Sequence, residues 1–230
     1  MQHSWYDWPG GREAMVRIGP ATGPTILILP PLFEEANRMR RILIEVMRGL
    51  AGQGLGSAFP DLPGMNDSPV STVNARFDDW AAAVASVAET LPRPLLTVAI
   101  RGGAVLDGFA RPDARWRLSP ESGKRVLRDM LRATALTGTM KMAELEARAR
   151  TNAERLAGNP IHPDLFIALD AAAPEPVEAR LAAIGETADG ADVTFGGSPP
   201  WRRAEPEDDP ALVAAMVDDI AHWVTTCATR

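Results

Sequence analysis

The chain has 230 residues, 46% of them hydrophobic, which is enough to bury one sizeable core but short for two complete α/β domains. Its 24 Lys and Arg against 30 Asp and Glu give a net charge of -6, the wrong sign for a protein that binds phosphate backbones. We therefore expect a single domain over residues 1–230 and exclude nucleic acid as a partner.

The first third of the chain begins with two apolar runs of strand character, Met15–Ile18 and Thr25–Leu29. The second run, TILIL, is continuously apolar, as in strands that are buried on both faces of a sheet. A one-face apolar pattern over residues 38–50 then predicts a helix that ends at Gly52.

The order strand, loop, helix then repeats. GSAF at residues 56–59 predicts a short strand, Phe77–Leu91 carries apolar residues on one helical face, and Leu95–Ile100 predicts a third strand. This alternation predicts βαβ units and a parallel sheet with helices on both faces. In such sheets functional residues gather beyond the carboxyl ends of the strands.

The second half of the chain is richer in helical sequence. RWRLSP at residues 115–120 predicts a fourth parallel strand, and 123–169 is almost wholly helical in propensity, which predicts a cap inserted between strands. Two short strands and a terminal helix complete the prediction: Arg180–Ile184, Asp192–Phe195 and Pro210–Cys227.

The stretch LLTVAIRGGAVLD, residues 95–107, passes from a strand into what we predict to be the first turn of a helix. A tight strand-to-helix turn needs small residues, which Ala99, Gly102 and Gly103 supply, and it lifts the central side chain to the top of the sheet. This is the pattern of a nucleophile elbow, but the central residue is Arg101. Arginine stays protonated and is not a nucleophile for acyl transfer.

Three segments, in this order, resemble the α/β-hydrolase superfamily: ILPPLFEEANR as an oxyanion loop, FPDLPGMNDS as the loop after the next strand, and AIRGG as the elbow. PPLFEEANRMRR, RWRLSPESGKRVLRDMLR and GGSPPW resemble more closely the second class of exosortase-A-system-associated hydrolases, a bacterial family found with exopolysaccharide and protein-sorting loci. The resemblance spans roughly Thr25 to Trp223. It implies an α/β-hydrolase fold, a mostly parallel sheet flanked by helices, with 123–169 as a helical cap insertion.

The other members of a catalytic triad can be sought in the same sequence. The histidine would lie in 196–209, which contains none. We expect His3 in a disordered end, His162 in a break of the cap and His222 in the terminal helix to be surface or packing residues.

The acid of a triad would follow Arg180–Ile184, where Glu186 and Asp189 are candidates, although acidic loop residues are usually only solvated. Ser68 has no histidine near it in sequence and is expected to form a turn, and Asp61 is expected to brace the same loop.

Arg101 itself has two possible roles. With the backbone N–H groups of 102–104 at a helix N-terminus it would bind an anion, or Glu34 and Glu35 of the facing loop would neutralise it internally. We favour internal pairing because a guanidinium on the floor of a pocket must be satisfied. The candidate ligand-binding residues are Arg101, Gly102, Gly103, Leu32, Phe33, Asn37 and Trp201, and Trp201 would either form a pocket wall or pack under the cap.

These residues lead to three functional hypotheses. The leading one is a catalytically degenerate hydrolase fold that binds a small acyl or anionic ligand, linked by resemblance to exopolysaccharide or exosortase systems. The rival is an active ester or thioester hydrolase in which Glu35 activates a water over Arg101. The third is a protein-binding cap surface around Met130, Leu131, Met140 and Met142, although methionine-rich faces are more often core.

The remaining features set limits on compartment and cofactors. The sequence has no basic segment followed by an apolar one at its start, and no window approaches 18 uninterrupted apolar residues. We expect a cytoplasmic protein without a membrane span, in which a homo-oligomer is possible. The single Cys227 cannot form an internal disulfide and has no metal-ligand spacing around it, so we predict a structural or incidental thiol, no metal and no cofactor.

Overall fold

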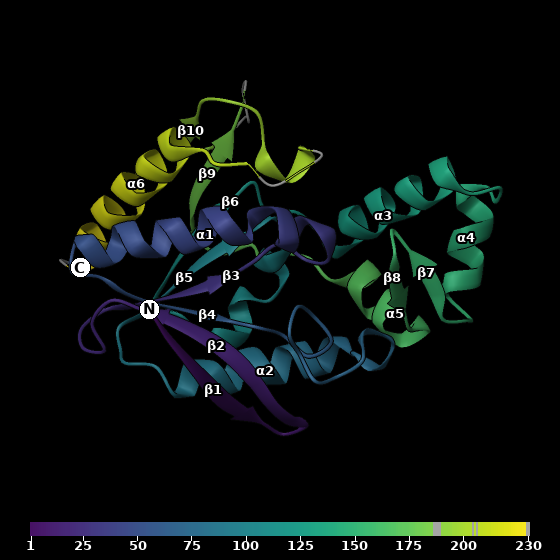
Figure 1. The fold of residues 1–230 in the computed structure, drawn as a ribbon, viewed down its shortest axis with the longest axis horizontal. Helices are drawn as coiled ribbons and strands as arrows, with labels where there is room; N and C mark the ends of the chain where they lie inside the picture. Colours follow the sequence, from purple (N-terminus) through teal and green to yellow (C-terminus); the bar gives the residue numbers. More distant parts are fainter. Residues whose placement is uncertain (186–189, 204, 206, 229–230) are drawn as a thin grey trace.

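The structure, a computed structural model, describes residues 1–185, 190–203, 205 and 207–228. In this part of the chain eight strands form one sheet in the order β1-β2-β4-β3-β5-β6-β9-β10 (Figure 1). The strands are β1 (Gln2–Trp8), β2 (Gly11–Ile18), β3 (Thr25–Leu29), β4 (Gly56–Pro60), β5 (Leu95–Ile100), β6 (Ala114–Leu118), β9 (Arg180–Ile184) and β10 (Val193–Phe195). The helices that flank the sheet are α1 (Glu34–Gly52), α2 (Phe77–Glu89) and α6 (Pro210–Ala228).

Six neighbouring strands of this sheet, from β4 to β10, run parallel, and the hairpin β1–β2 joins antiparallel at one side. The predicted strands TILIL, GSAF, LLTVAI and RWRL are β3, β4, β5 and β6, and they are parallel members of the one sheet, as predicted. The carboxyl ends of β3, β5 and β6 therefore lie at the same edge of the sheet.

The core has two layers because side chains alternate across each strand. In β3, Ile26 and Ile28 pack with residues of α1 and α6, whereas Leu27 and Leu29 pack with α2 and the cap, and all four are fully buried. Figure 1 shows α1 and α6 on one side of the sheet and α2 on the other.

The cap contains α3 (Gly123–Thr137), α4 (Met142–Ala149), β7 (Glu154–Leu156), β8 (Asn159–Ile161) and α5 (Pro163–Ala171). Figure 1 shows these elements grouped at the end of the sheet where β3 and β5 finish. The helical pattern of the cap was predicted to break at residues 158–163, where β8 lies, but the strand β7 that pairs with it as a hairpin was not predicted. The two turn residues of the hairpin, Ala157 and Gly158, have φ values of 45° and 84°, as a tight hairpin turn requires.

The N-terminal segment also differs from the prediction, which placed a disordered end before a strand at Met15. Residues 2–18 instead form the β1–β2 hairpin, with His3 in β1. The hairpin is fixed to the sheet by Tyr6, which is buried and whose hydroxyl donates to the Asp61 carbonyl at 2.6 Å.

The helix predicted over residues 38–50 begins earlier, at Glu34, where two acidic residues in the first turn suit the helix dipole. In the described residues, none of the helices has the length and apolar character needed to cross a membrane.

Candidate functional site

The turn after β5 has the geometry of an elbow. Arg101 follows the last residue of β5 with a φ of 54°, an unfavourable backbone angle for a residue with a side chain. A Cβ on Gly103 would lie 2.6 Å from the Leu29 carbonyl oxygen and closer still to that of Pro30, so only glycine allows this approach to β3. The chain continues in a helical turn, as predicted, which is a 3-10 helix over Arg101–Val105, consistent with two adjacent glycines of low helix propensity.

The Arg101 side chain is enclosed and paired on two sides. It is 7% exposed, and its Nε and Nη2 donate to the two carboxylate oxygens of Glu35 at 3.2 and 3.1 Å. Its Nη1 donates to Glu121 at 2.9 Å. Burial alone would lower the pKa of Arg101, but the hydrogen bonds and charges of Glu35 and Glu121 outweigh it and raise the pKa above its ordinary value.

An aromatic ring packs on the same guanidinium. The Arg101 Cζ lies 4.8 Å from the centroid of the Trp201 ring, a cation–π distance. Trp201 is buried in the α1–α6 layer of the core, and its carbonyl accepts from Arg38 at 2.8 Å. Its ring lies on the elbow guanidinium, within the α1–α6 layer and not in the apolar cluster that the cap shares with the sheet. It comes from the segment between β10 and α6, where a hydrolase triad would place its histidine.

Glu121 is a site residue that the sequence reasoning missed. It follows β6, the strand beside β5, and its backbone N–H donates to the Arg101 carbonyl at 3.2 Å. The signal was present, because residues after neighbouring parallel strands meet at one edge of the sheet.

The other predicted site residues fall into three groups. Leu32, Phe33, Gly102 and Gly103, predicted to bind a ligand, are buried at the elbow. Glu34 is exposed and accepts from Asn159 of the cap at 3.5 Å, and Asn37 is exposed on α1. Neither contacts Arg101 in the described structure, because only Glu35 of this turn of α1 faces the guanidinium. Glu186 and Asp189 lie outside the described residues.

A small cavity lies between α1 and the cap helix α3, beside the elbow. Its volume is about 150 Å³. Its apolar wall consists of Leu32, Phe33, Val126, Met130, Ala133 and Ala157. Glu34, Glu35, Arg38 and Asp129 supply its charged rim, which is more acidic than basic.

The histidines and Ser68 do not form a second catalytic group in the described part of the chain. His162 caps α5 by accepting from the Asp164 N–H at 3.1 Å, and His3 and His222 are exposed. Ser68 accepts from the backbone N–H groups of residues 64 and 70 and donates to Glu13 at 2.9 Å, which is turn chemistry as predicted.

Asp61 braces that loop by accepting from Arg40 and Asn66, each at 3.0 Å. No group of His, Cys, Asp and Glu suited to a metal ion occurs among the described residues.

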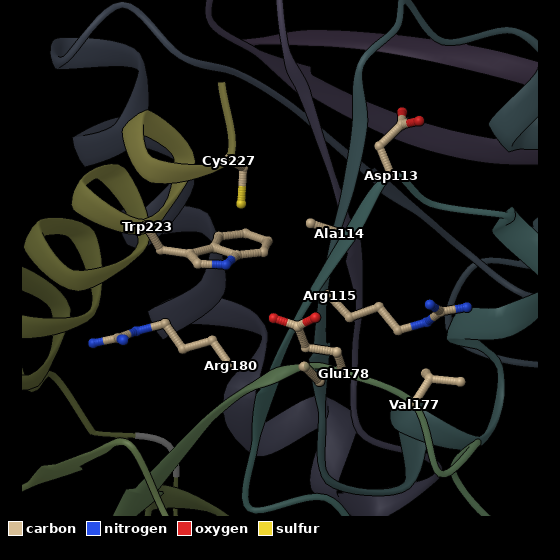
Figure 2. Close-up of a pocket in the computed structure, with 9 residues that line it drawn as sticks. Asp113, Ala114, Arg115, Val177, Glu178, Arg180, Trp223 and Cys227 are labelled. Atoms are coloured by element: carbon tan, nitrogen blue, oxygen red, sulfur yellow. The ribbon is translucent and has the colours of Figure 1, made fainter. Parts of the chain in front are cut away.

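A larger cavity of about 350 Å³ lies at the opposite end of the sheet, where β6 and β9 begin (Figure 2). Figure 2 shows the guanidinium groups of Arg115 and Arg180 pointing away from each other, with Trp223 and Cys227 of α6 on one side. Arg115 pairs with Glu175 and Arg180 with Asp219, so the two cations do not converge on a ligand.

Comparisons with solved structures identify the architecture. Est1E from Butyrivibrio proteoclasticus, solved with ferulic acid bound, superimposes with a TM-score of 0.69 at 10% identity, over 96% of this chain and 99% of that one. Alpha/beta hydrolase domain-containing protein 10 from mouse gives 0.67 at 14% identity, over 98% and 99% of the two chains. A serine hydrolase without a lid from Xanthomonas campestris gives 0.57 at 13% identity, over 96% and 94%.

No protein-family profile matches the sequence, and no curated protein matches it either. Identities this low between similar structures show the fold alone. The sheet order, the elbow after β5 and these superpositions agree that the chain has the α/β-hydrolase fold.

Proposed function

We propose that this chain is a catalytically silent α/β-hydrolase-fold protein that binds a small acyl ligand under its cap. The observation that carries the proposal is Arg101 at the elbow, held by Glu35 and Glu121 and covered by Trp201. Acyl transfer on this fold needs a nucleophile at the elbow and a base after the last strand. These two positions hold a guanidinium and an indole, and neither group can attack a carbonyl or accept the proton.

The rival, in which Glu35 activates a water, is less well supported. Both Glu35 oxygens accept from Arg101, so the carboxylate is committed to the ion pair. A general base must instead present an oxygen to the water whose proton it takes.

The ligand class follows from the charges around the cavity. Four carboxylates lie around the cavity and the elbow, Glu34, Glu35, Glu121 and Asp129, against the two cations Arg38 and Arg101, so the local charge is negative. An anion would meet repulsion there, and of the two predicted ligand types we retain the acyl one. A cavity of about 150 Å³ accommodates a short, uncharged acyl group against its apolar wall.

The motif resemblance extends the proposal to the second class of exosortase-A-system-associated hydrolases and to a cytoplasmic role in exopolysaccharide production. The segments PPLFEEANRMRR and GGSPPW support it, and they include Glu35 and Trp201, two of the residues around Arg101. Deletion of the gene in its host should lower secreted polysaccharide, and the protein should fractionate with the cytoplasm. Unchanged polysaccharide would remove this part of the proposal and leave the rest standing.

Catalytic silence is tested by labelling and turnover. We expect no labelling by a fluorophosphonate probe and no hydrolysis of short p-nitrophenyl esters, with an active serine hydrolase as the positive control. Arg101→Ser should also stay inactive because it lacks a base. Saturable hydrolysis by the wild type that disappears in Glu35→Gln would overturn the proposal in favour of the rival.

Ligand binding is tested by thermal shift with short-chain primary amides, and with carboxylates of the same length for comparison. The amides should raise the melting temperature more than the carboxylates do. Ala133→Trp, on the exposed part of the cavity wall, should abolish the shift, and Arg132→Trp on the same exposed helix face is the matched control. An effect confined to carboxylates would point to anion binding instead.

A further inference from the structure

In the part of the chain that the structure describes, no strand pairs with the outer edge of β1. β1 is the terminal strand of the sheet, seven residues long, and its strand partner is β2. Edge strands are commonly protected by lysine, proline or a bulge, because their unpaired backbone groups can bind another strand. The sequence of β1, QHSWYDW, contains no lysine or proline, and its pairing with β2 runs without a bulge.

The register of β1 shows which backbone groups face outward. Trp5 pairs with Ala14 of β2, and the Ala14 carbonyl accepts from the Asp61 N–H on the far side of β2 at 2.9 Å. Ala14 therefore directs its backbone groups away from β1. In an antiparallel ladder the opposed residue does the same, so the N–H and C=O of Trp5 face outward, and those of His3 and Asp7 share this direction.

These three residues also carry exposed side chains, as does Gln2 at the start of β1. Tyr6 is buried against the core, whereas His3 and Asp7 are exposed and Trp5 is 57% exposed. Arg12 of β2 lies beside this face, 3.4 Å from Asp7 and 5.9 Å from the Trp5 ring centroid. The outer edge of β1 therefore presents the outward backbone N–H and C=O groups of three residues together with the exposed indole ring of Trp5.

The sequence of this edge is complementary to itself. When two copies pair antiparallel about a two-fold axis at Trp5, each Trp5 lies opposite Trp5 of the other copy. His3 then lies opposite Asp7 of the second copy, and Asp7 opposite its His3, on the same exposed face. Cross-strand pairs of aromatic rings and of an imidazole N–H with a carboxylate stabilise antiparallel strands.

From this register we propose that two copies of the chain form a symmetric dimer through their β1 edges, joining the two sheets into one. α2 packs against β1, and the half-buried residues in the middle of this helix are small: Ala81, Ala82, Ala85 and Ser86. The larger side chains of α2 that are half-buried or exposed lie at its two ends, at Phe77, Asp78, Asp79 and Glu89, so the middle of the helix leaves room for a second copy. The proposal of a dimer does not depend on the proposal that the elbow is catalytically silent.

The proposal is tested by sedimentation equilibrium over a range of protein concentrations. The wild type should show a concentration-dependent dimer. Trp5→Pro removes an outward N–H that β2 does not use, and it should give a monomer, whereas Trp5→Thr keeps that N–H and should only weaken the dimer. Circular dichroism of Trp5→Pro checks that the fold is retained.

A charge exchange tests the register without proline. His3→Asp places two carboxylates opposite each other twice per dimer and should weaken the dimer about tenfold. The double variant His3→Asp with Asp7→His restores both pairs and should recover the wild-type affinity. A wild type that is monomeric at every concentration would overturn the proposal. A dimer that neither Trp5→Pro nor His3→Asp weakens would also overturn it, by placing the interface elsewhere.

Discussion

Arg101 places a charged side chain that forms ion pairs at a strained position, where its φ is positive. A positive φ at an elbow normally serves to present a nucleophile, and here it presents a cation to Glu35 and Glu121. The two glutamates come from different parts of the chain, the start of α1 and the loop after β6. A single side chain therefore links the core of the sheet to the segment that leads into the cap.

We predict that Arg101→Ala lowers the free energy of unfolding by about 2 to 4 kcal/mol, because it leaves two partly buried carboxylates without a counter-charge. Replacing Glu35 and Glu121 by Gln in the same variant should recover part of this loss. Urea denaturation of the wild type, the single and the triple variants measures both effects. A neutral Arg101→Ala that abolishes protection by a ligand would instead make Arg101 a ligand-binding residue.

Glu13 should give the protein a distinct pH dependence. It is fully buried, and burial raises its pKa above the ordinary 4.5; the Ser68 hydrogen bond opposes this shift and the Asp61 charge adds to it. As pH rises from 4.5 toward the raised pKa, the unfolded chain loses this proton before the folded one. The contribution of Glu13 to the free energy of unfolding therefore falls across this pH range.

Glu13→Gln should therefore be more stable than the wild type at neutral pH, and the difference should shrink as pH falls to about 4. The measurement is the free energy of unfolding from urea titrations across this range. A variant that is less stable at every pH would show that Glu13 is charged and well paired in the folded protein.

At the scale of elements, the elbow depends on close contact between β5 and β3. We predict that Gly103→Ala destabilises the protein by about 3 kcal/mol or more, because its Cβ would overlap the backbone carbonyls of Leu29 and Pro30, which cannot move within the sheet. Gly196→Ala is the control, because a Cβ there meets no atom within 4 Å and should change stability by less than about 0.5 kcal/mol. Chemical denaturation compares the two, and equal effects would contradict the argument.

The buried parallel strands were predictable from the sequence, and the exposed ones were not. Thr25–Leu29 and Leu95–Ile100 were predicted with the bounds they have, because runs of apolar residues mark strands covered on both faces. β1 was missed because its residues are mostly exposed, and its one deep anchor, Tyr6, binds a loop 55 residues away. A local pattern of apolar and polar residues cannot reveal a partner so distant in the sequence.

Only the part of the candidate site that depends on local sequence could be predicted. The pairing of Arg101 with Glu35 followed from the elbow and the facing loop, and the structure has it. For Glu121 the strand before it was predicted but not its place beside β5, and the position of the Trp201 ring depends on the path of the segment after β10. Glu34 and Glu35 could not be separated in the sequence, because only the start of α1 at Glu34 decides which of them faces inward.

At the scale of the whole molecule, the cap and the sheet share one apolar cluster. Leu127 and Met130 of α3 belong to the same buried cluster as Leu29 of β3 and Trp80 of α2. The third hypothesis, a protein-binding surface on the cap, loses support from Met130 and Leu131, which are core residues.

We predict that cap and sheet unfold together, as one domain over residues 1–230. Far-UV and near-UV circular dichroism should give coincident thermal transitions, because separating the cap would expose the shared cluster to water. Two resolved transitions, or hydrogen exchange in α3–α5 that is much faster than in β3 and β5, would show that the cap is a separate unit.

The anchoring of Arg101 also restricts which sequences can be reached from this one by single substitutions. Serine at position 101 would supply a hydroxyl but leave Glu35 and Glu121 facing each other's charge, and without a histidine it would not be activated. Histidine at position 201 would by itself remove the indole that covers the guanidinium and supply a base with no nucleophile. Either single substitution lowers stability and gains no activity. A serine hydrolase could therefore evolve from this sequence only through intermediates that are less stable and still inactive.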